Sequence, residues 1–145
     1  MSADTKANVL LAVDLGPAES AWHIRAAINL AADLARDGAD HVVVLHVREF
    51  SVWRLAPMML EHGGAAGCQA VEEIVSRLRG VGVSASALIR EADGGHVAQT
   101  ILDVADEFNA RFIVLSSPRH RVTVRRVAQQ LIRQAHVPVA IQPTS

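Results

Sequence analysis

Short apolar runs alternate along the chain with longer segments in which apolar residues recur at helical spacing. Each run has the length of a strand, and the nearly continuous hydrophobicity of the first two suits parallel strands that are covered on both faces. The third run alternates with polar residues, which indicates a strand with one wetter face at an edge of the sheet. The predicted strands are residues 8–13, 41–47, 83–89, 112–115 and 137–141.

Four amphipathic helices are predicted between these strands. The first ends at Gly38, where glycine can adopt the left-handed conformation of a helix C-cap, and the third ends near Asn109. Between residues 51 and 68 the pattern is weak, and we expect at most a short helix that is broken at Gly63-Gly64. The residues expected on the buried faces are Ala27, Leu30, Ala31 and Leu34 in the first helix, Val71, Ile74, Val75 and Leu78 in the second, Val97, Ile101, Val104, Ala105 and Phe108 in the third, and Val127, Ala128, Leu131, Ile132 and Ala135 in the fourth.

Strands that alternate with helices through short connections predict an α/β fold with an open, five-stranded parallel sheet and helices on both faces. Right-handed crossovers favour the strand order 3-2-1-4-5, and residues 1–145 form one predicted domain. Pro138 lacks a backbone N–H, which favours an edge position for the last strand. In this order the carboxyl ends of strands one and four, at Asp14 and at Ser116-Ser117, border one crevice where a ligand is expected.

Charge is distributed unevenly along the chain. The net charge is −1, yet the segment after Leu115 holds five arginines and no acidic residue. This asymmetry indicates either an anionic partner or a solvated basic surface that balances an acidic one. A single cysteine, Cys68, excludes an internal disulfide and is typical of a reducing cytoplasm, and no apolar run is long enough to span a membrane. Residues 1–6 show no secretory signal pattern.

Motifs for catalysis, metal binding and nucleic-acid binding are missing from the sequence. The seven histidines do not form a metal signature, since His41 and His46 project from opposite faces of one strand and the others lie on separate elements. No serine elbow and no P-loop lysine occur, so we expect no enzymatic turnover. The basic loop has no aromatic residue for base stacking, which makes nucleic acid an unfavourable partner.

The order of several short pieces resembles the universal stress protein family. These pieces are Asn8-Val9-Leu10-Leu11-Ala12-Val13-Asp14, Val44-Leu45-His46-Val47, Phe112-Ile113-Val114-Leu115-Ser116-Ser117 and Ala135-His136-Val137-Pro138-Val139. The resemblance implies an adenine site near Asp14 and Val47, with phosphates on a glycine-rich loop after strand four of the form G-x-x-G-x(9)-G-[S/T]. It also implies a homodimer that pairs through the last strand, with Val137, Val139 and Ile141 at the interface.

The glycine-rich loop departs from the family pattern in this chain. Ser116 and Arg119 stand where its first two glycines would be, Arg125-Arg126 stands at the closing pair, and the loop is about four residues shorter. Backbone N–H groups need glycine to approach phosphate closely, so the usual cradle is degraded. The residues expected to border a nucleotide or anion are Ala12, Val13, Asp14, Val47, Leu115, Ser116, Ser117, Arg119, Arg125 and Arg126.

Two interpretations of the basic loop stay open. If Thr123 caps the fourth helix, Arg125 and Arg126 oppose the helix dipole, and together with Arg119 and Arg121 they could grip an anion through their side chains. Alternatively, the arginines point into water and ATP binding has been lost. The sequence thus predicts a non-catalytic stress-response module that binds ATP, another adenine nucleotide or an anion. The alternative is a dimeric protein-interaction module with an empty crevice.

Overall fold

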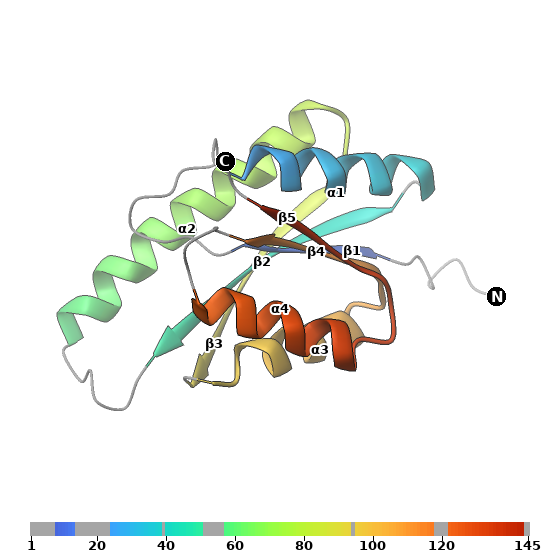
Figure 1. The fold of residues 1–145 in the computed structure, drawn as a ribbon. Helices are drawn as coiled ribbons and strands as arrows, with labels where there is room; N and C mark the ends of the chain where they lie inside the picture. The colour runs from blue at the N-terminus through green and yellow to red at the C-terminus, as the bar shows by residue number, and fades with distance from the viewer. Residues whose placement is uncertain are drawn as a thin grey trace.

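One parallel sheet with helices on both faces organises the chain (Figure 1). The computed structural model describes residues 8–13, 24–38, 40–50, 57–93, 95–117 and 122–143. Strands and helices alternate as the apolar pattern predicts. They are β1 (Asn8–Val13), α1 (Arg25–Gly38), β2 (His41–Phe50), α2 (Pro57–Gly80), β3 (Ala85–Asp93), α3 (Val97–Glu107), β4 (Ala110–Ser117), α4 (Val122–Gln134) and β5 (Val139–Pro143).

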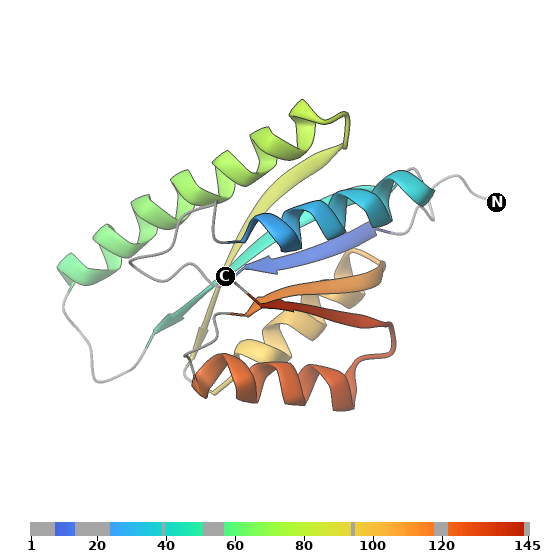
Figure 2. The ribbon, with the colours of Figure 1, turned by 45° about the horizontal axis from the view of Figure 1, so that its top comes forward.

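The strand order is β3-β2-β1-β4-β5 and every pairing is parallel, which confirms the predicted topology. The chain steps from β1 outward to β3 and then returns to the other side of β1 with β4. Right-handed crossovers therefore place α1 and α2 on one face of the sheet and α3 and α4 on the other (Figure 2). Strands β3 and β5 are the two edges, as expected.

Both faces of the sheet are buried, which explains why β1 is apolar at nearly every position. Val9 and Leu11 pack with α1 and α2, whereas Leu10 and Ala12 pack with α3 and α4. Successive side chains of a strand point to opposite faces, so a strand between two helical layers needs apolar residues throughout. The helix patterns were also largely correct, since Ala27, Ala31, Val71, Ile74, Val75, Leu78, Ile101, Val104, Ala105, Ala128 and Leu131 are buried.

Gly38 does not act as a left-handed C-cap. It is the last residue of α1, and the positive φ angles at described glycines occur at Gly82 and Gly95. A Cβ at Gly38 would instead overlap the Nη2 atom of Arg111 and lie 2.6 Å from Oδ2 of Asp40. Glycine is therefore needed for close approach of the Arg111–Asp40 ion pair. Asn109, in contrast, adopts φ 51 after α3, as its predicted position at a helix end requires.

Helix α2 is longer than the sequence pattern indicates. It runs unbroken from Pro57 to Gly80, so the predicted break at Gly63-Gly64 is wrong. Residues from Val71 onward bury one face of this helix, and propagation from an anchored helix costs far less than nucleation. Two glycines, at about 0.5–1 kcal/mol each, do not stop such a helix.

Strands β2 and β3 also extend beyond their predicted ends. Val13 of β1 lies opposite His46, but β2 continues to pair with β3 from Val47–Arg90 to Phe50–Asp93. The ion pair between Arg48 and Glu91, 3.5 Å apart, lies on this extension. The apolar pattern did not predict this extension, because its residues are largely polar. Backbone pairing there does not require a buried side chain on each face.

Ile132 of α4 is a further correction. It was expected on the buried face, but 60% of its surface is exposed, whereas Leu131 beside it is fully buried. Helix α4 also begins at Val122, so Thr123 lies inside the helix and is not its N-cap. In the last strand, pairing begins at Val139 instead of 137, and Pro138 precedes it.

Candidate functional site

The carboxyl ends of three neighbouring strands meet at one edge of the sheet. Val13 of β1 lies opposite His46 of β2, and Ala12 of β1 lies opposite Leu115 of β4. Ser116 therefore comes next to the end of β1, and Val47 follows His46. This confirms that β1 and β4 are adjacent, which is the condition for a crevice at the switch point of the sheet.

Of the six predicted site residues whose side chains the structure describes, four are buried and support the edge from beneath. Ala12, Val13 and Leu115 are each no more than 5% exposed, and Ser116 is completely buried. Ser116 also has an interaction within the protein. Val47, at the end of β2, is half-buried and presents part of its side chain to solvent. A ligand here would thus meet the strand ends and the loops that follow them, with these side chains supporting the backbone beneath.

Several predicted site residues cannot be placed. Asp14 and Arg119 lie outside the described residues, and for Ser117 and Arg125 only the backbone within β4 and α4 is described. The position of Arg125 in the first turn of α4 follows from the helix bounds. Whether these groups converge on an anion stays a prediction.

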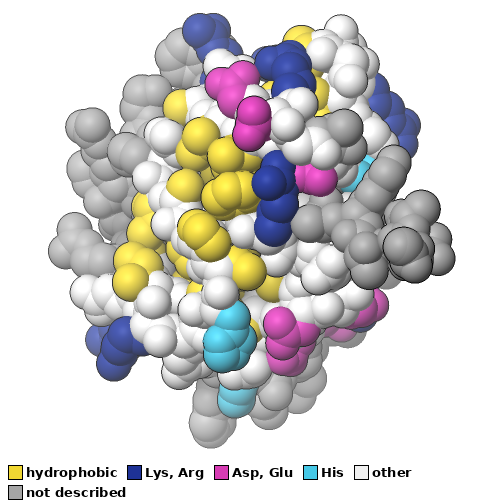
Figure 3. Space-filling model, turned by 90° about the vertical axis from the view of Figure 1, so that its right-hand side faces the viewer, with side chains coloured by type: hydrophobic (Ala, Val, Ile, Leu, Met, Phe, Trp, Pro, Cys, Tyr) yellow, Lys and Arg dark blue, Asp and Glu magenta, His cyan; other side chains and the backbone are white. Residues whose placement is uncertain are grey.

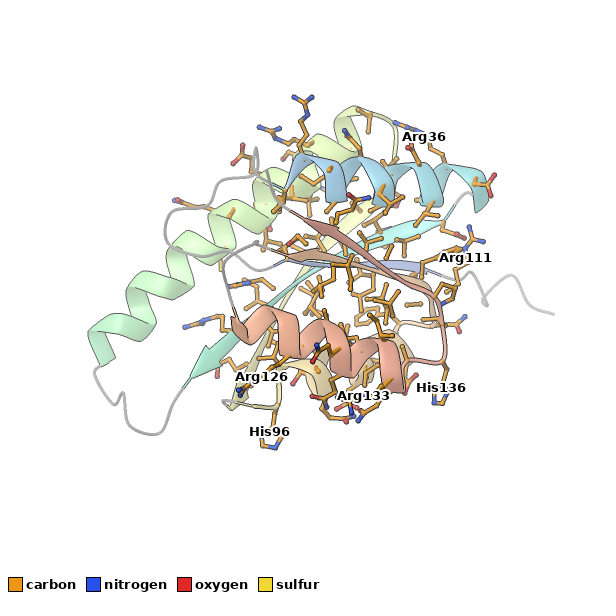
Figure 4. All side chains as sticks on the ribbon, in the orientation of Figure 1. Arg36, His96, Arg111, Arg126, Arg133 and His136 are labelled. Atoms are coloured by element: carbon orange, nitrogen blue, oxygen red, sulfur yellow. The ribbon has the colours of Figure 1, made fainter. Side chains whose placement is uncertain are left out.

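Arg126 is described, and it points away from the sheet. Its side chain is exposed and lies on the side of α4 opposite the sheet, on the same side as Arg133 (Figure 4). Two residues seven apart share a helix face, and Ala128 and Leu131 occupy the buried one. This placement favours the interpretation in which Arg126 extends into water.

His46 is a residue that the sequence analysis considered only as a metal ligand. It is a buried polar side chain, 8% exposed, at the carboxyl end of β2. Its Nδ1 atom lies 3.3 Å from the carbonyl oxygen of Val13, at the last residue of β1. The imidazole thus ties together the two strand ends that border the crevice. The sequence signal for this role was the position of His46 at the end of an apolar run, immediately before Val47.

A second polar cluster lies where β2 and β3 begin, at the opposite end of the strands. His41 Nδ1 is 2.6 Å from Ser84 Oγ, and His41 Nε2 is 2.8 Å from Ser86 Oγ. Burial lowers the pKa of His41 below its usual 6.5, and the positive charge of Arg79 lowers it further. Arg79 donates hydrogen bonds to the carbonyl oxygen of Ala85 at 3.0 and 3.2 Å. These bonds connect the edge strand β3 to β2 and α2.

Two hollows lie between helices. A cavity of about 180 Å³ lies between α3 and the end of α4, with Asp106 and His136 among its lining residues. It is smaller than the roughly 300–1,000 Å³ typical of ligand pockets. A groove of about 600 Å³ lies between α1 and α2, where Arg36 pairs with Asp33 and Arg77 pairs with Glu73. Two of the three described arginines that line this groove, Arg36 and Arg77, are thus already partly neutralised.

Over the described part of the chain, no helix is long and apolar enough to cross a membrane. Within those same ranges, His, Cys, Asp and Glu do not gather in groups of three that could hold a metal ion.

Comparison with known proteins decides the family. Residues 7–143 match the universal stress protein family over nearly the whole chain. The chain belongs to the universal stress protein family. Among curated proteins, none matches this sequence significantly.

Solved universal stress proteins share this fold. A universal stress protein family member from Burkholderia pseudomallei superposes with a TM-score of 0.74 at 23% identity, covering 99% of this chain and 100% of that one. The Archaeoglobus fulgidus universal stress protein in complex with dAMP gives 0.70 at 22% identity, with 94% and 98% covered. An Arabidopsis thaliana family member with AMP bound gives 0.65 at 18% identity, with 96% and 92% covered. At these identities the likeness establishes the fold.

Proposed function

We propose that this universal stress protein is a non-catalytic stress-response module that binds an adenine nucleotide, or another phosphate-bearing anion, at the carboxyl edge of β1, β2 and β4. The observation that carries the proposal is the pairing of β1 with both β2 and β4. It brings Val47, the end of β1 and the end of β4, where the basic connection starts, to one edge. In open α/β sheets, ligands bind at such a point.

Two solved relatives of the same fold support an adenine nucleotide as the ligand, because one is a complex with dAMP and another has AMP bound. In this chain, Asp14 and Val47 would lie on the base side. The phosphate side would depend on Arg119 and Arg125 in place of a glycine cradle, since arginine forks bind phosphate through paired hydrogen bonds.

A homodimer through β5, with Val137, Val139 and Ile141 at the interface, is part of the proposal. The apolar edge strand supports it, because an unpaired edge readily templates another chain. We place the protein in the cytoplasm, since its single cysteine, Cys68, is exposed and free.

A second function, a dimeric interaction module without nucleotide, is favoured by two placements. Ser116 is buried, where a glycine of the family pattern would let the backbone meet phosphate, and Arg126 points away from the sheet. In this alternative the dimer surface carries the function.

Titration calorimetry with ATP, ADP and AMP at low salt tests the proposal. We expect heat from at least one nucleotide and weaker binding in Asp14→Ala and Arg119→Gln. Arg133→Gln is the matched control, since Arg133 is exposed in the last turn of α4, far from the crevice. Absence of heat for all three nucleotides rules out the nucleotide site and leaves the interaction module. Unchanged affinity in Asp14→Ala leaves Asp14 only a turn role.

A further inference from the structure

A serine and a histidine lie in hydrogen-bond contact at the end of the sheet where the strands begin. The Oγ atom of Ser84, in the connection between α2 and β3, is 2.6 Å from Nδ1 of His41, the first residue of β2. The other ring nitrogen, Nε2, is 2.8 Å from Oγ of Ser86 in β3. Proteins activate serine with a base beside the hydroxyl and a third group that orients the base. The proposed nucleotide site lies at the opposite end of the strands.

Ser84 is fixed in place although its side chain is exposed. Its neighbours Val83 and Ala85 are each no more than 4% exposed, and its carbonyl oxygen accepts a hydrogen bond from the N–H of Val42 at 2.9 Å. Because the backbone is anchored on both sides of Ser84, the hydroxyl is held against the imidazole ring before any other molecule arrives. Positioning of this kind lowers the barrier to a reaction.

The imidazole of His41 is suited to accept a proton near neutral pH. Burial lowers its pKa below the usual 6.5, and the positive charge of Arg79 lowers it further, so the neutral ring predominates. A neutral imidazole has one donor and one acceptor nitrogen. In the tautomer with the proton on Nε2, the ring donates to Ser86 and accepts from the hydroxyl of Ser84. This tautomer activates the more accessible hydroxyl, since Ser86 is half-buried within β3.

A positive charge without an acidic partner lies beside the two serines. Arg79 donates from Nε and Nη2 to the carbonyl oxygen of Ala85, the residue between Ser84 and Ser86, at 3.2 and 3.0 Å. Within the described ranges Arg79 forms no ion pair, and its Nη1 group donates no hydrogen bond. Figure 3 shows the end of the molecule where the strands begin, with Lys and Arg side chains among acidic ones above a band of hydrophobic surface. The surroundings of Ser84 therefore favour an electrophile that carries negative charge.

We propose that Ser84 is a site of covalent acylation, with His41 as its base and an acyl phosphate as the acyl donor. The hydroxyl oxygen attacks the carbonyl carbon of the donor, so an ester bond to Ser84 forms and the bond from that carbon to the phosphate oxygen breaks. The departing phosphate takes the electron pair of the broken bond. The hydroxyl proton passes to Nδ1 of His41 and then to this phosphate, while Arg79 attracts the phosphate group through its Nη1 donors. Each chain reacts once, so the modification requires no turnover and does not depend on the nucleotide site.

The composition of the chain leaves few competing nucleophiles. Lys6 is the only lysine and Cys68 the only cysteine, so a Lys6→Arg, Cys68→Ser background removes both side chains. Ser76 supplies an internal control, because it is exposed on α2 and forms no hydrogen bond to a histidine within the described ranges. With acetyl phosphate as the probe, we expect acetylation of Ser84 and little or none of Ser76. Tandem mass spectrometry of proteolytic peptides measures both.

Substitutions at the cluster test the role of each group. His41→Gln keeps a hydrogen-bonding side chain but removes the base, and it should slow the acetylation of Ser84 at least about a hundredfold. Ser86→Ala frees the ring and should slow the reaction several-fold, whereas Ser86→Thr restores the hydroxyl and should recover the rate. Circular dichroism checks that each variant is folded.

Three results would overturn the proposal. They are acetylation of Ser84 no faster than that of Ser76, an unchanged rate in folded His41→Gln, and acetylation at Ser86 instead of Ser84. The comparison of Ser84 with Ser76 is made within one protein, so it decides the proposal even where a variant fails to fold.

Discussion

The close approach of Arg111 to Gly38 predicts an unusual response to a simple substitution. Gly38→Ala should stabilise an ordinary helix by up to about 0.5–1 kcal/mol, because alanine is the better helix former. Here the added Cβ would occupy the space of the Arg111 guanidinium. That guanidinium donates to Asp40 and to the carbonyl oxygen of Leu34, and it lies 5.1 Å from the centre of the Phe112 ring.

Displacing Arg111 would weaken the pairing of the Asp40 carboxylate, whose side chain is only 7% exposed. A buried acceptor that loses its donor costs about 1–3 kcal/mol. After the helix gain is subtracted, Gly38→Ala should destabilise the protein by up to about 2.5 kcal/mol. In an Arg111→Met background the same substitution should be neutral or stabilising, since the guanidinium is gone and the Asp40 carboxylate, no longer held by it, can turn away from the new Cβ.

Urea unfolding followed by circular dichroism measures this cycle of four variants. The prediction is a change of sign for Gly38→Ala between the two backgrounds, with a coupling energy of about 1–3 kcal/mol. If Gly38→Ala stabilises both backgrounds equally, the guanidinium does not occupy that space and the reasoning is refuted.

Two further predictions concern a surface and a titrating group. Ile132→Lys should raise the dimer dissociation constant at least about tenfold, measured by analytical ultracentrifugation, because it puts a charge on α4, which packs on β4 and on the edge strand β5. Gln129→Lys adds the same charge at an exposed position of α4 and should change the dimer dissociation constant little. Equal effects of the two substitutions would contradict an interface that includes Ile132. Because the pKa of His41 is lowered in the folded protein, the free energy of unfolding should fall as pH decreases below 6.5. The stability difference between wild type and His41→Gln should therefore be larger at about pH 7.5 than at about pH 5, and parallel pH profiles would contradict it.

The sheet could be predicted from the sequence because burial on both faces leaves a strong pattern. Positions such as Leu10 and Leu11 must both be apolar, and few folds other than a parallel sheet between helical layers require this. The strand order followed from crossover handedness. Ile132 was wrongly predicted as buried. The apolar pattern of a helix does not show whether the residues at the side of its apolar face contact another element or solvent. Gly38 was misassigned because the group that requires a glycine there, Arg111, lies far away in sequence.

Only the location of the candidate site followed from the sequence. Adjacent strand ends follow from topology, so the meeting of Val13 with the segment after Leu115 was predictable. The burial of Ser116 and the contact of His46 with Val13 depend on packing between strands, which a linear pattern does not encode.

A crystal structure after soaking with AMP tests the central claim most directly. The account predicts density for the nucleotide at the carboxyl ends of β1, β2 and β4, with adenine beside Val47 and phosphate near the connection that follows Ser117. A crevice that stays empty at saturating AMP, or AMP bound elsewhere, would contradict it.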